Sequence, residues 1–312
     1  RVLLGYKKKN RRTEHELHPP PAMLPYATAS DAEAALRRAM TRAEAAWFGY
    51  TAAKADYYLY YHTVAVLLAV YTLLPLMLAL LELGAPALAM RYKLQPRGKR
   101  LSPAGFLRCY TDTPRFLLPL AAPVQLLSYP AVKMLGIRMG LPLPSAGEMA
   151  AQLLMYLLVE DYLSYWVHRL MHTKWCYDNI HHVHHEYTAP NGFVAPYMHW
   201  TEVLILTVPT VVGPVIAPCH MITFGIWFVI VAISAIETHC GYNFPFNPTK
   251  LIPLWGGAEF HDYHHYLGGN CQSNFATVFT YCDYLYGTDN AFRRHKAGQA
   301  KLKMVAEKNV EK

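Results

Sequence analysis

VLILTVPTVVGPVIAPCHMITFGIWFVIVAISAI, residues 203–236, contains no Asp, Glu, Lys or Arg in its 34 positions. Gly213-Pro214 and the run at 217–220 interrupt this apolar stretch, which predicts two helices joined by a tight turn. Each arm has roughly 17–19 residues, and about 20 helical residues cross the hydrocarbon core of a bilayer. The stretch therefore predicts a helical hairpin that crosses a membrane and returns.

Other apolar segments extend this plan. Residues 59–81 carry no formal charge, although Pro75 predicts a kink. Residues 116–132 are uncharged but short and contain three prolines, whereas 148–172 has a helical pattern. We therefore expect an all-α protein with several membrane helices.

Charge predicts how these helices are oriented. The loop expected at 91–115 holds seven Lys and Arg against one Asp, and the positive-inside rule places such a loop in the cytosol. The simplest arrangement has two hairpins, 116–168 and 201–239, whose open ends face the cytosol. The segment 59–90 either crosses once or re-enters, and both possibilities stay open.

Histidines are concentrated in one part of the chain. Twelve of the 16 lie between residues 168 and 265, and most form three clusters: HRLMH at 168–172, HHVHH at 181–185 and HDYHH at 261–265. In a helix, histidines at i, i+3 and i+4 converge on one face. Imidazole binds iron, zinc, copper or nickel, and the eight histidines that share this register exceed what one zinc ion uses. The clusters therefore predict two metals with about four histidines each.

The expected hairpin adds a ninth ligand, because a chain that crosses and recrosses returns His239 to the side of the first two clusters. The predicted metal ligands are His168, His172, His181, His184, His185, His239, His261, His264 and His265. His199, Asp161, Glu237 and Asp262 are possible additional ligands or hydrogen-bonding partners of the ligands. Asp161 is the best placed of these, seven residues before His168 on the same helical face. His182 is predicted to point off the face used by the ligands, and His220 to lie at the far turn.

These observations together give the predicted fold class. It is an all-α integral membrane helical bundle of two or more helical hairpins with a cytosolic histidine-rich di-metal cap. Other interpretations of the histidines are weaker. The sequence has no HExxH motif, which argues against a metalloprotease. A metal transporter would place its ligands near the middle of the membrane rather than at helix ends.

Composition sets the remaining limits. Hydrophobic residues make up 53% of the chain and charged residues 16%, against about 25% charged in a soluble domain. The six cysteines include no CxxC pair, so neither a disulfide framework nor a zinc ribbon is indicated. Residues 1–22 carry +4 of the net charge of +8 and are expected to be upstream or leader sequence. Residues 23–290 are predicted to form one membrane domain and 291–312 a basic C-terminal tail, and no nucleic-acid partner is expected.

Longer motifs around the histidines resemble a known family. EDYLSYWVHRLMHTKWCYDNIHHVHHEYTAP at 160–190, AIETHCGYNFP at 235–245 and GGAEFHDYHHYLGGNCQSNFATVFTYCDYLYGTD at 256–289 are similar to the fatty acid hydroxylase/sterol desaturase superfamily. Within it they look like plant-type sterol 4α-methyl oxidases. Residues 23–50 resemble the start of the branch associated with 4,4-dimethylsterols. The resemblance covers roughly residues 23–290.

The resemblance implies a function. It implies that two iron ions occupy the histidine clusters (with zinc possible in a purified sample) and that O2 oxidises a C4 methyl group stepwise. It further implies electrons from NAD(P)H through a reductase and a b-type cytochrome. It also implies a multi-pass endoplasmic reticulum protein whose metal site faces the cytosol, with other sterol C4-demethylation enzymes as partners. A fatty-acyl or other lipid hydroxylase, a desaturase and an aldehyde-processing enzyme of the same superfamily remain alternatives, because the histidines alone do not separate them.

Overall fold

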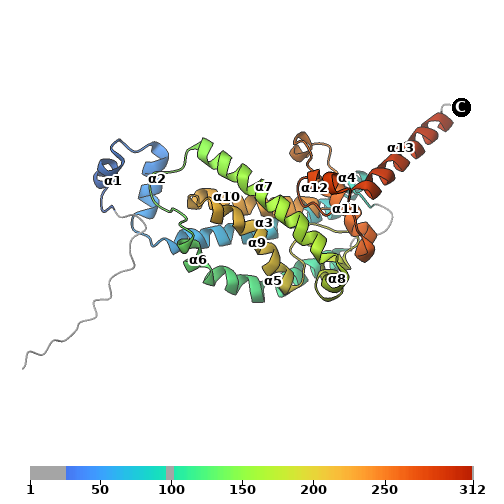
Figure 1. Cartoon of the computed structure of the whole chain (residues 1–312), viewed down its shortest axis with the longest axis horizontal. Helices are drawn as coiled ribbons and strands as arrows, with labels where there is room; N and C mark the ends of the chain where they lie inside the picture. The colour runs from blue at the N-terminus through green and yellow to red at the C-terminus, as the bar shows by residue number, and fades with distance from the viewer. Residues whose placement is uncertain (1–25, 96–101, 311–312) are drawn as a thin grey trace, which may run out of the picture. The chain divides into compact units, whose positions relative to one another are not determined.

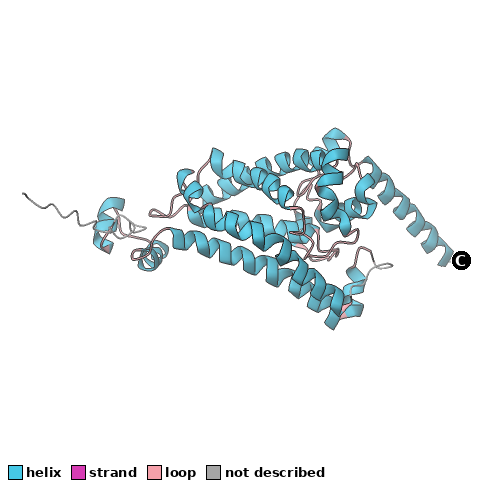
Figure 2. Ribbon diagram, turned by 90° about the horizontal axis from the view of Figure 1, so that it is seen from below, coloured by secondary structure: helices cyan, strands magenta, loops and turns pink. Residues whose placement is uncertain are grey.

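The computed structural model describes residues 26–95 and 102–310 of the chain. The described residues form helices and loops and no strand (Figure 2), as the all-α prediction requires. They divide into two compact units, one up to Tyr58 with Gly140–Leu143 and one formed by Leu59–Met139 and Pro144–Lys312. The elements are α1 Ala29–Leu36, α2 Arg42–Thr51, α3 Tyr57–Gly84, α4 Pro86–Tyr92, α5 Pro103–Leu127, α6 Tyr129–Met134, α7 Ala146–Met171, α8 Lys174–Asn179, η1 His181–Glu186, α9 Trp200–Ile216, α10 Met221–Thr238, η2 Pro248–Leu251, α11 Gly257–Leu267, η3 Gly268–Asn270, α12 Tyr281–Tyr286 and α13 Asn290–Val310.

The first unit contains two short helices with matching caps. Thr28 caps α1 and Thr41 caps α2, and in both helices the third residue of the helix returns a carboxylate to the cap. Glu44, the returning residue of α2, also accepts two hydrogen bonds from Arg38, and this partner holds the pKa of Glu44 down at about 2. Local capping and one ion pair therefore define this unit.

The apolar stretch at 203–236 forms two helices, α9 and α10, joined by a short turn, as predicted. Gly213-Pro214 does not interrupt the first of them, however, because α9 continues to Ile216. Pro214 lacks the N–H that would bond the carbonyl of Thr210 one turn earlier. The indole of Trp227 on α10 donates to that carbonyl at 2.8 Å, which satisfies the acceptor that the proline leaves free.

The long helix α7 packs along α9 in the second unit (Figure 1). A Cβ at Gly213 would lie 2.7 Å from the Tyr156 ring, so only glycine permits this approach. The Tyr156 ring also packs edge-on against Trp227, with centroids 5.7 Å apart. These contacts connect α7, α9 and α10, and the helix predicted at 148–172 is confirmed as α7.

Two segments differ from the prediction. Part of the expected loop at 91–115 is helical, since α5 begins at Pro103 after Ser102, whose hydroxyl accepts from the Gly105 amide. The basic C-terminal tail is also helical, as α13, and it extends away from the other helices of its unit (Figures 1 and 2). The loop and the tail were both predicted from their many basic residues. Lys and Arg are good helix formers, however, so a basic segment can be helical. Residues 1–22, which are expected to be upstream or leader sequence, lie outside the described residues.

Two described helices are long and apolar enough to cross a membrane by length and composition: α3 with 28 residues and α10 with 18. The neighbouring α9 is apolar but one residue shorter than α10. Of the most apolar window of α3, only 11% is buried within the protein. The apolar surface of α3 is therefore left largely uncovered by the described chain.

Candidate metal centre

Nine buried histidines come together in two neighbouring groups, and the potential ligand atoms within each group all lie within 4.8 Å of one another. Group one contains His168, His172, His181, His185 and His264, and group two contains His184, His239, His261 and His265. These are the nine residues that the sequence predicts as metal ligands, eight from their spacing and His239 from the expected hairpin. The structure shows that the four segments carrying them meet at one place.

Four elements supply the nine side chains. The C-terminal end of α7 provides the first cluster, η1 the second, the C-cap of α10 provides His239, and α11 the third cluster. Each HxxHH cluster is divided between the groups: η1 gives two histidines to group one and one to group two, and α11 does the reverse. The second cluster is a 3-10 helix rather than an α-helix. The two groups are thus interlocked through the same short segments.

The imidazoles approach one another through their Nε2 atoms. In group one, the Nε2 of His181 lies 3.1 Å from that of His172 and 3.1 Å from that of His185, which is 3.2 Å from that of His264. In group two, the Nε2 of His239 lies 3.0 Å from those of His184 and His261. Each group therefore concentrates nitrogen atoms at its centre.

This arrangement fits a pair of metal ions. Metal–imidazole bonds are about 2.0–2.1 Å long, so two ligands at right angles on one ion have nitrogens about 3 Å apart. The observed separations match that value. The Nε2 atoms of His168 and His265 are buried and have no hydrogen-bond partner among the described residues. A cation in each group would satisfy these two atoms and remove the repulsion between the converging lone pairs.

The outward nitrogens fix the rings. In five of the nine imidazoles, Nδ1 faces a backbone carbonyl at 2.7–3.1 Å: those of His168, His184, His239, His264 and His265 face Phe275, Tyr197, Ala235, Ser273 and Tyr187 respectively. A carbonyl only accepts, so each of these Nδ1 atoms carries the proton and each Nε2 is left free as a ligand. The chain thereby prepares the correct tautomer.

Two buried aspartates hold the loop that supplies two of these carbonyls. Asp283 accepts hydrogen bonds from the amides of Phe275 and Ala276, at 2.9 and 2.7 Å. Asp161 accepts from the amides of Val278 and Phe279, at 3.1 and 2.9 Å. The loop is therefore anchored on both sides of the Phe275 carbonyl that faces a group-one histidine.

Burial keeps the imidazoles neutral. Desolvation lowers the pKa of His184 to about 4, and desolvation together with neighbouring histidines lowers the pKa of His172 to about 2. The pKa values of His264 and His265 also lie well below the ordinary value for the same reasons. Neutral imidazole is the form that binds a metal, so the electrostatics of the site favour ligation.

The four additional candidates lie elsewhere. His199 caps α9, where its Nδ1 accepts from the Thr201 amide at 3.3 Å. Glu237 accepts from Asn247, Thr249 and Trp255, and Asp262 from Gln95. Asp161 bonds the backbone, as described above, and reaches no imidazole directly. The expectation that Asp161 bonds a ligand therefore does not match the structure, because helix α7 turns its carboxylate toward the loop after α11.

A carboxylate that spacing did not single out takes that position. Glu202, in the first turn of α9, bonds the Nδ1 of His181 through Oε1 at 2.7 Å, and both side chains are buried. It was one of several carboxylates near the clusters in the sequence. Nothing in its spacing from His181 distinguishes it, because the contact depends on how α9 packs beside η1.

Two other histidines lie outside the groups, as expected. His182 is exposed and its Nδ1 contacts the Tyr177 carbonyl at 3.3 Å. His220 caps the start of α10, at the opposite end of that helix from His239. Neither belongs to a potential metal group among the described residues.

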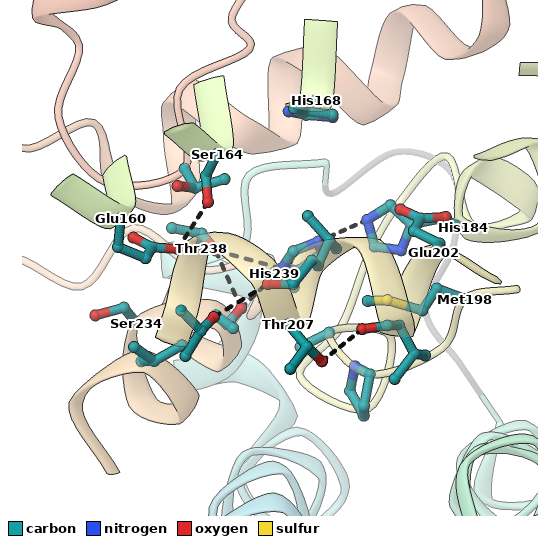
Figure 3. Close-up of a pocket in the computed structure, with 18 of the residues that line it drawn as sticks. Glu160, Ser164, His168, His184, Met198, Glu202, Thr207, Ser234, Thr238 and His239 are labelled. Atoms are coloured by element: carbon teal, nitrogen blue, oxygen red, sulfur yellow. Dashed lines mark hydrogen bonds between the residues drawn. The ribbon is translucent and has the colours of Figure 1, made fainter. Parts of the chain in front are cut away.

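A cavity of about 290 Å³ adjoins the centre. Side chains from α3, α7, α9 and α10 line its mainly apolar walls, and five histidines also line it: His168, His181, His184, His239 and His261. Figure 3 shows His168, His184 and His239 facing the same space as Glu160, Ser164 and Met198. Pockets that enclose drug-sized ligands have about 300–1,000 Å³. The cavity is thus of a size for a small apolar molecule placed against the histidines.

Comparison with known proteins identifies similar sequences. A family model described as "Fatty acid hydroxylase" matches residues 153–288, which include all nine histidines. The chain is 62% identical over 290 residues to the very-long-chain aldehyde decarbonylase GL1-10 of Oryza sativa subsp. japonica, covering 93% of this chain and 96% of that protein.

Two relatives with another name match over almost the same length at lower identity. Methylsterol monooxygenase 1-1 of Arabidopsis thaliana is 53% identical over 289 residues, covering 92% of this chain and 97% of the relative. Methylsterol monooxygenase 1-2 of the same plant is 52% identical over 289 residues, covering 92% and 96%. No solved structure matches the chain significantly.

Proposed function

The chain belongs to the fatty acid hydroxylase family, and we propose that it is a membrane di-iron monooxygenase that oxidises a C4 methyl group of 4,4-dimethylsterols. The observation that carries this proposal is the apolar cavity whose wall contains histidines of both groups. A lipid in that cavity has a carbon–hydrogen bond beside two sets of free imidazole nitrogens. Products of successive rounds are the hydroxymethyl, the aldehyde and the carboxylate.

Unactivated methyl groups require more than acid–base chemistry. Two iron ions, bound by the nine histidines, would supply oxidation by O2, which no amino-acid side chain provides. The chain itself holds six of the imidazoles in the ligating tautomer, five through backbone carbonyls and one through Glu202. The walls of the cavity orient the substrate and keep water from the reacting carbon.

The membrane location is supported by apolar surface that the described chain leaves uncovered. Leu73, Met77 and Leu80 of α3 are 56%, 64% and 59% exposed. A soluble monomer rarely exposes so continuous an apolar face, and lipid covers it without cost. We propose a multi-pass protein of the endoplasmic reticulum whose hairpins place the metal centre on the cytosolic side. A sterol dissolved in the bilayer reaches the cavity laterally.

Electron supply and partners complete the proposal. Oxidation by O2 consumes two electrons per round, and we propose NAD(P)H as their source, through a reductase and a b-type cytochrome. Other enzymes of sterol C4 demethylation are proposed as neighbours in the membrane, because the carboxylate must be removed by a further reaction. No nucleic-acid partner is proposed.

A second candidate is favoured by one observation. The 62% identical relative carries the name of an aldehyde decarbonylase, so a long-chain aldehyde is the alternative substrate. A hydroxylase or desaturase acting on a fatty-acyl chain is a third possibility within the family. The histidine pattern is compatible with each of them.

The decisive experiment supplies purified protein in lipid nanodiscs with iron, a reductase, a b-type cytochrome, NADPH and O2. One reaction contains a 4,4-dimethylsterol and the other a long-chain aldehyde, and products are identified by mass spectrometry. We expect 4-hydroxymethyl, 4-formyl and 4-carboxy sterols with no shortened alkane. Alkane formation from the aldehyde, with the sterol untouched, would replace our proposal with the alternative. A His239→Ala protein is the negative control.

A further inference from the structure

Two polar side chains of α7 line the cavity next to a group-one histidine. Glu160, Ser164 and His168 follow one another at four-residue spacing along α7, and all three line the cavity. Residues four apart lie on the same face of a helix, one turn or about 6 Å from each other. The carboxyl of Glu160 and the hydroxyl of Ser164 are therefore placed within two turns of a group-one histidine (Figure 3).

Neither polar group is explained by the packing of the helices. Glu160 is 8% exposed and Ser164 is 2% exposed. Ser164 donates to the Oε1 of Glu160 at 2.8 Å. This bond occupies Oε1 and leaves the other carboxyl oxygen, Oε2, able to accept a hydrogen bond from a ligand in the cavity.

The opposite wall contrasts with this pair. Thr238 and Thr207 also line the cavity, but their hydroxyls donate to carbonyls of their own helices, at 3.0 and 2.8 Å. These two side chains are therefore already satisfied within the protein. The Glu160–Ser164 pair is different, because its bond leaves an acceptor facing the cavity.

We propose that Glu160 and Ser164 form a hydrogen-bonding subsite for a substrate hydroxyl that lies close to the carbon being oxidised. This inference rests on the proposed function and deepens it. In a 4,4-dimethylsterol the hydroxyl is on ring carbon 3, directly beside the carbon that bears the reacting methyl groups. The hydroxyl donates to Oε2 of Glu160, and the hydroxyl of Ser164 holds the carboxyl in place. A long-chain aldehyde has no such alcohol.

The subsite would select substrates that carry the hydroxyl over analogues that lack it. A site built to bond a hydroxyl strongly rejects an analogue that lacks it, because the buried acceptor is then left unpaired. It also fixes the ring that carries the methyl group with respect to the histidines. The pair is thus a determinant of specificity and of positioning.

The test compares a 4,4-dimethylsterol with its 3-deoxy analogue, in which hydrogen replaces the hydroxyl. Both turnover (kcat/KM) and equilibrium binding of the radiolabelled sterol, with each compound as competitor, are measured in nanodiscs. The wild-type protein is expected to favour the hydroxylated sterol by at least about tenfold in both measurements. Ser164→Ala and Glu160→Leu are expected to lower this ratio about 3- to 10-fold, mainly through KM.

Thr207→Val is the matched control, because it removes a satisfied hydroxyl from the same cavity and should leave the ratio between the two sterols unchanged. Unchanged ratios in both Ser164→Ala and Glu160→Leu would overturn the subsite. If Glu160→Leu does not fold, Ser164→Ala decides alone, since it removes one oxygen. Binding separates this inference from the proposed function: a hydroxyl preference in binding without sterol turnover would leave the subsite standing and refute the oxidation.

Discussion

The tautomers of six of the nine histidines are set by groups that the sequence does not reveal as partners. Carbonyl oxygens behind five of the nine rings fix the proton on Nδ1 and turn Nε2 inward. Glu202 does the same for His181 with a carboxylate, which strengthens the basicity of the ring. The metal affinity that we propose therefore depends on residues outside the three clusters.

Removing one ligand should abolish both binding and chemistry. His172→Ala and His264→Ala each take an Nε2 from the centre of group one. We expect loss of sterol oxidation together with loss of bound iron, measured by product analysis and by metal content. Retained turnover with normal metal content in either protein would contradict the assignment. His182→Ala, at an exposed position between two ligands, is the matched control and should keep both.

Glu202→Gln tests the group behind His181. The amide keeps the shape of the side chain and removes the carboxyl group that faces Nδ1. We expect a metal affinity about 10–100-fold weaker, as is typical when a partner of a ligating histidine is removed. Competition with a chelator of known affinity measures this change. An affinity equal to that of the wild type would show that Oε1 plays no part in ligation, and Glu186→Gln, outside the two groups, is the control.

The sequence identified the nine histidines that the structure brings together, but not their neighbours. Helical spacing predicted eight of them, because imidazoles at i, i+3 and i+4 share a face, and the return of the expected hairpin predicted His239. The carbonyls of Ser273 and Phe275 could not be predicted, since any residue provides one. The role of Asp161 in anchoring the loop, instead of bonding His168, follows from how the loop after α11 packs on α7.

At the scale of elements, helix α9 shows how a proline is accommodated within a membrane-like apolar helix. Trp227 of α10 donates to the Thr210 carbonyl, which lacks its usual partner because residue 214 is proline. The sequence predicted the pair of helices from its lack of charge. It also predicted a break at Gly213-Pro214, which was wrong, because a donor from the neighbouring helix cannot be inferred from the local sequence.

Trp227→Phe tests how much the hydrogen bond from the indole to the Thr210 carbonyl stabilises the protein. The change keeps an aromatic ring and removes the donor, which leaves a buried carbonyl unpaired and costs about 1–3 kcal/mol. We expect a lower Tm in detergent, measured by intrinsic fluorescence or calorimetry. Trp175→Phe is the matched control, because Trp175 is 67% exposed and its loss should change Tm little.

A second substitution separates the hydrogen bond from the loss of ring volume. Pro214→Ala restores the amide that bonds Thr210 within α9. In that background Trp227→Phe should cost less than in the wild type, and the difference is the coupling between the two residues. Equal costs in both backgrounds would mean that the indole contributes only by packing.

At the scale of the whole molecule, the ends of α7, α10 and α11 and the segment η1 are held together around buried neutral imidazoles. Only part of this arrangement was visible in the sequence. Apolar runs predicted α3, α9 and α10, whereas basic residues obscured the helices α5 and α13. A positive charge indicates the side of a membrane but not whether the backbone is helical.

The neutral histidines make the metal-free protein sensitive to acid. An unfolded histidine has a pKa of about 6.5, whereas burial lowers the pKa of His184 to about 4, so the unfolded chain takes up protons first as the pH falls. Stability should be full above pH 6.5 and should decline toward pH 4. Circular dichroism after chelation measures this, and iron should shift the transition to lower pH. Constant stability of the chelated protein between pH 6.5 and 4 would contradict the expectation.

Because each HxxHH segment sends side chains to both groups, the two metal positions share η1 and α11. An ion that binds at one position orders η1 and α11, and these segments also carry most of the ligands of the other position. Occupancy should then rise steeply, in pairs, and half-filled molecules should be scarce. A substitution of a histidine in either segment should therefore lower metal binding at both positions. A protein that holds a single ion and keeps part of the activity is not expected.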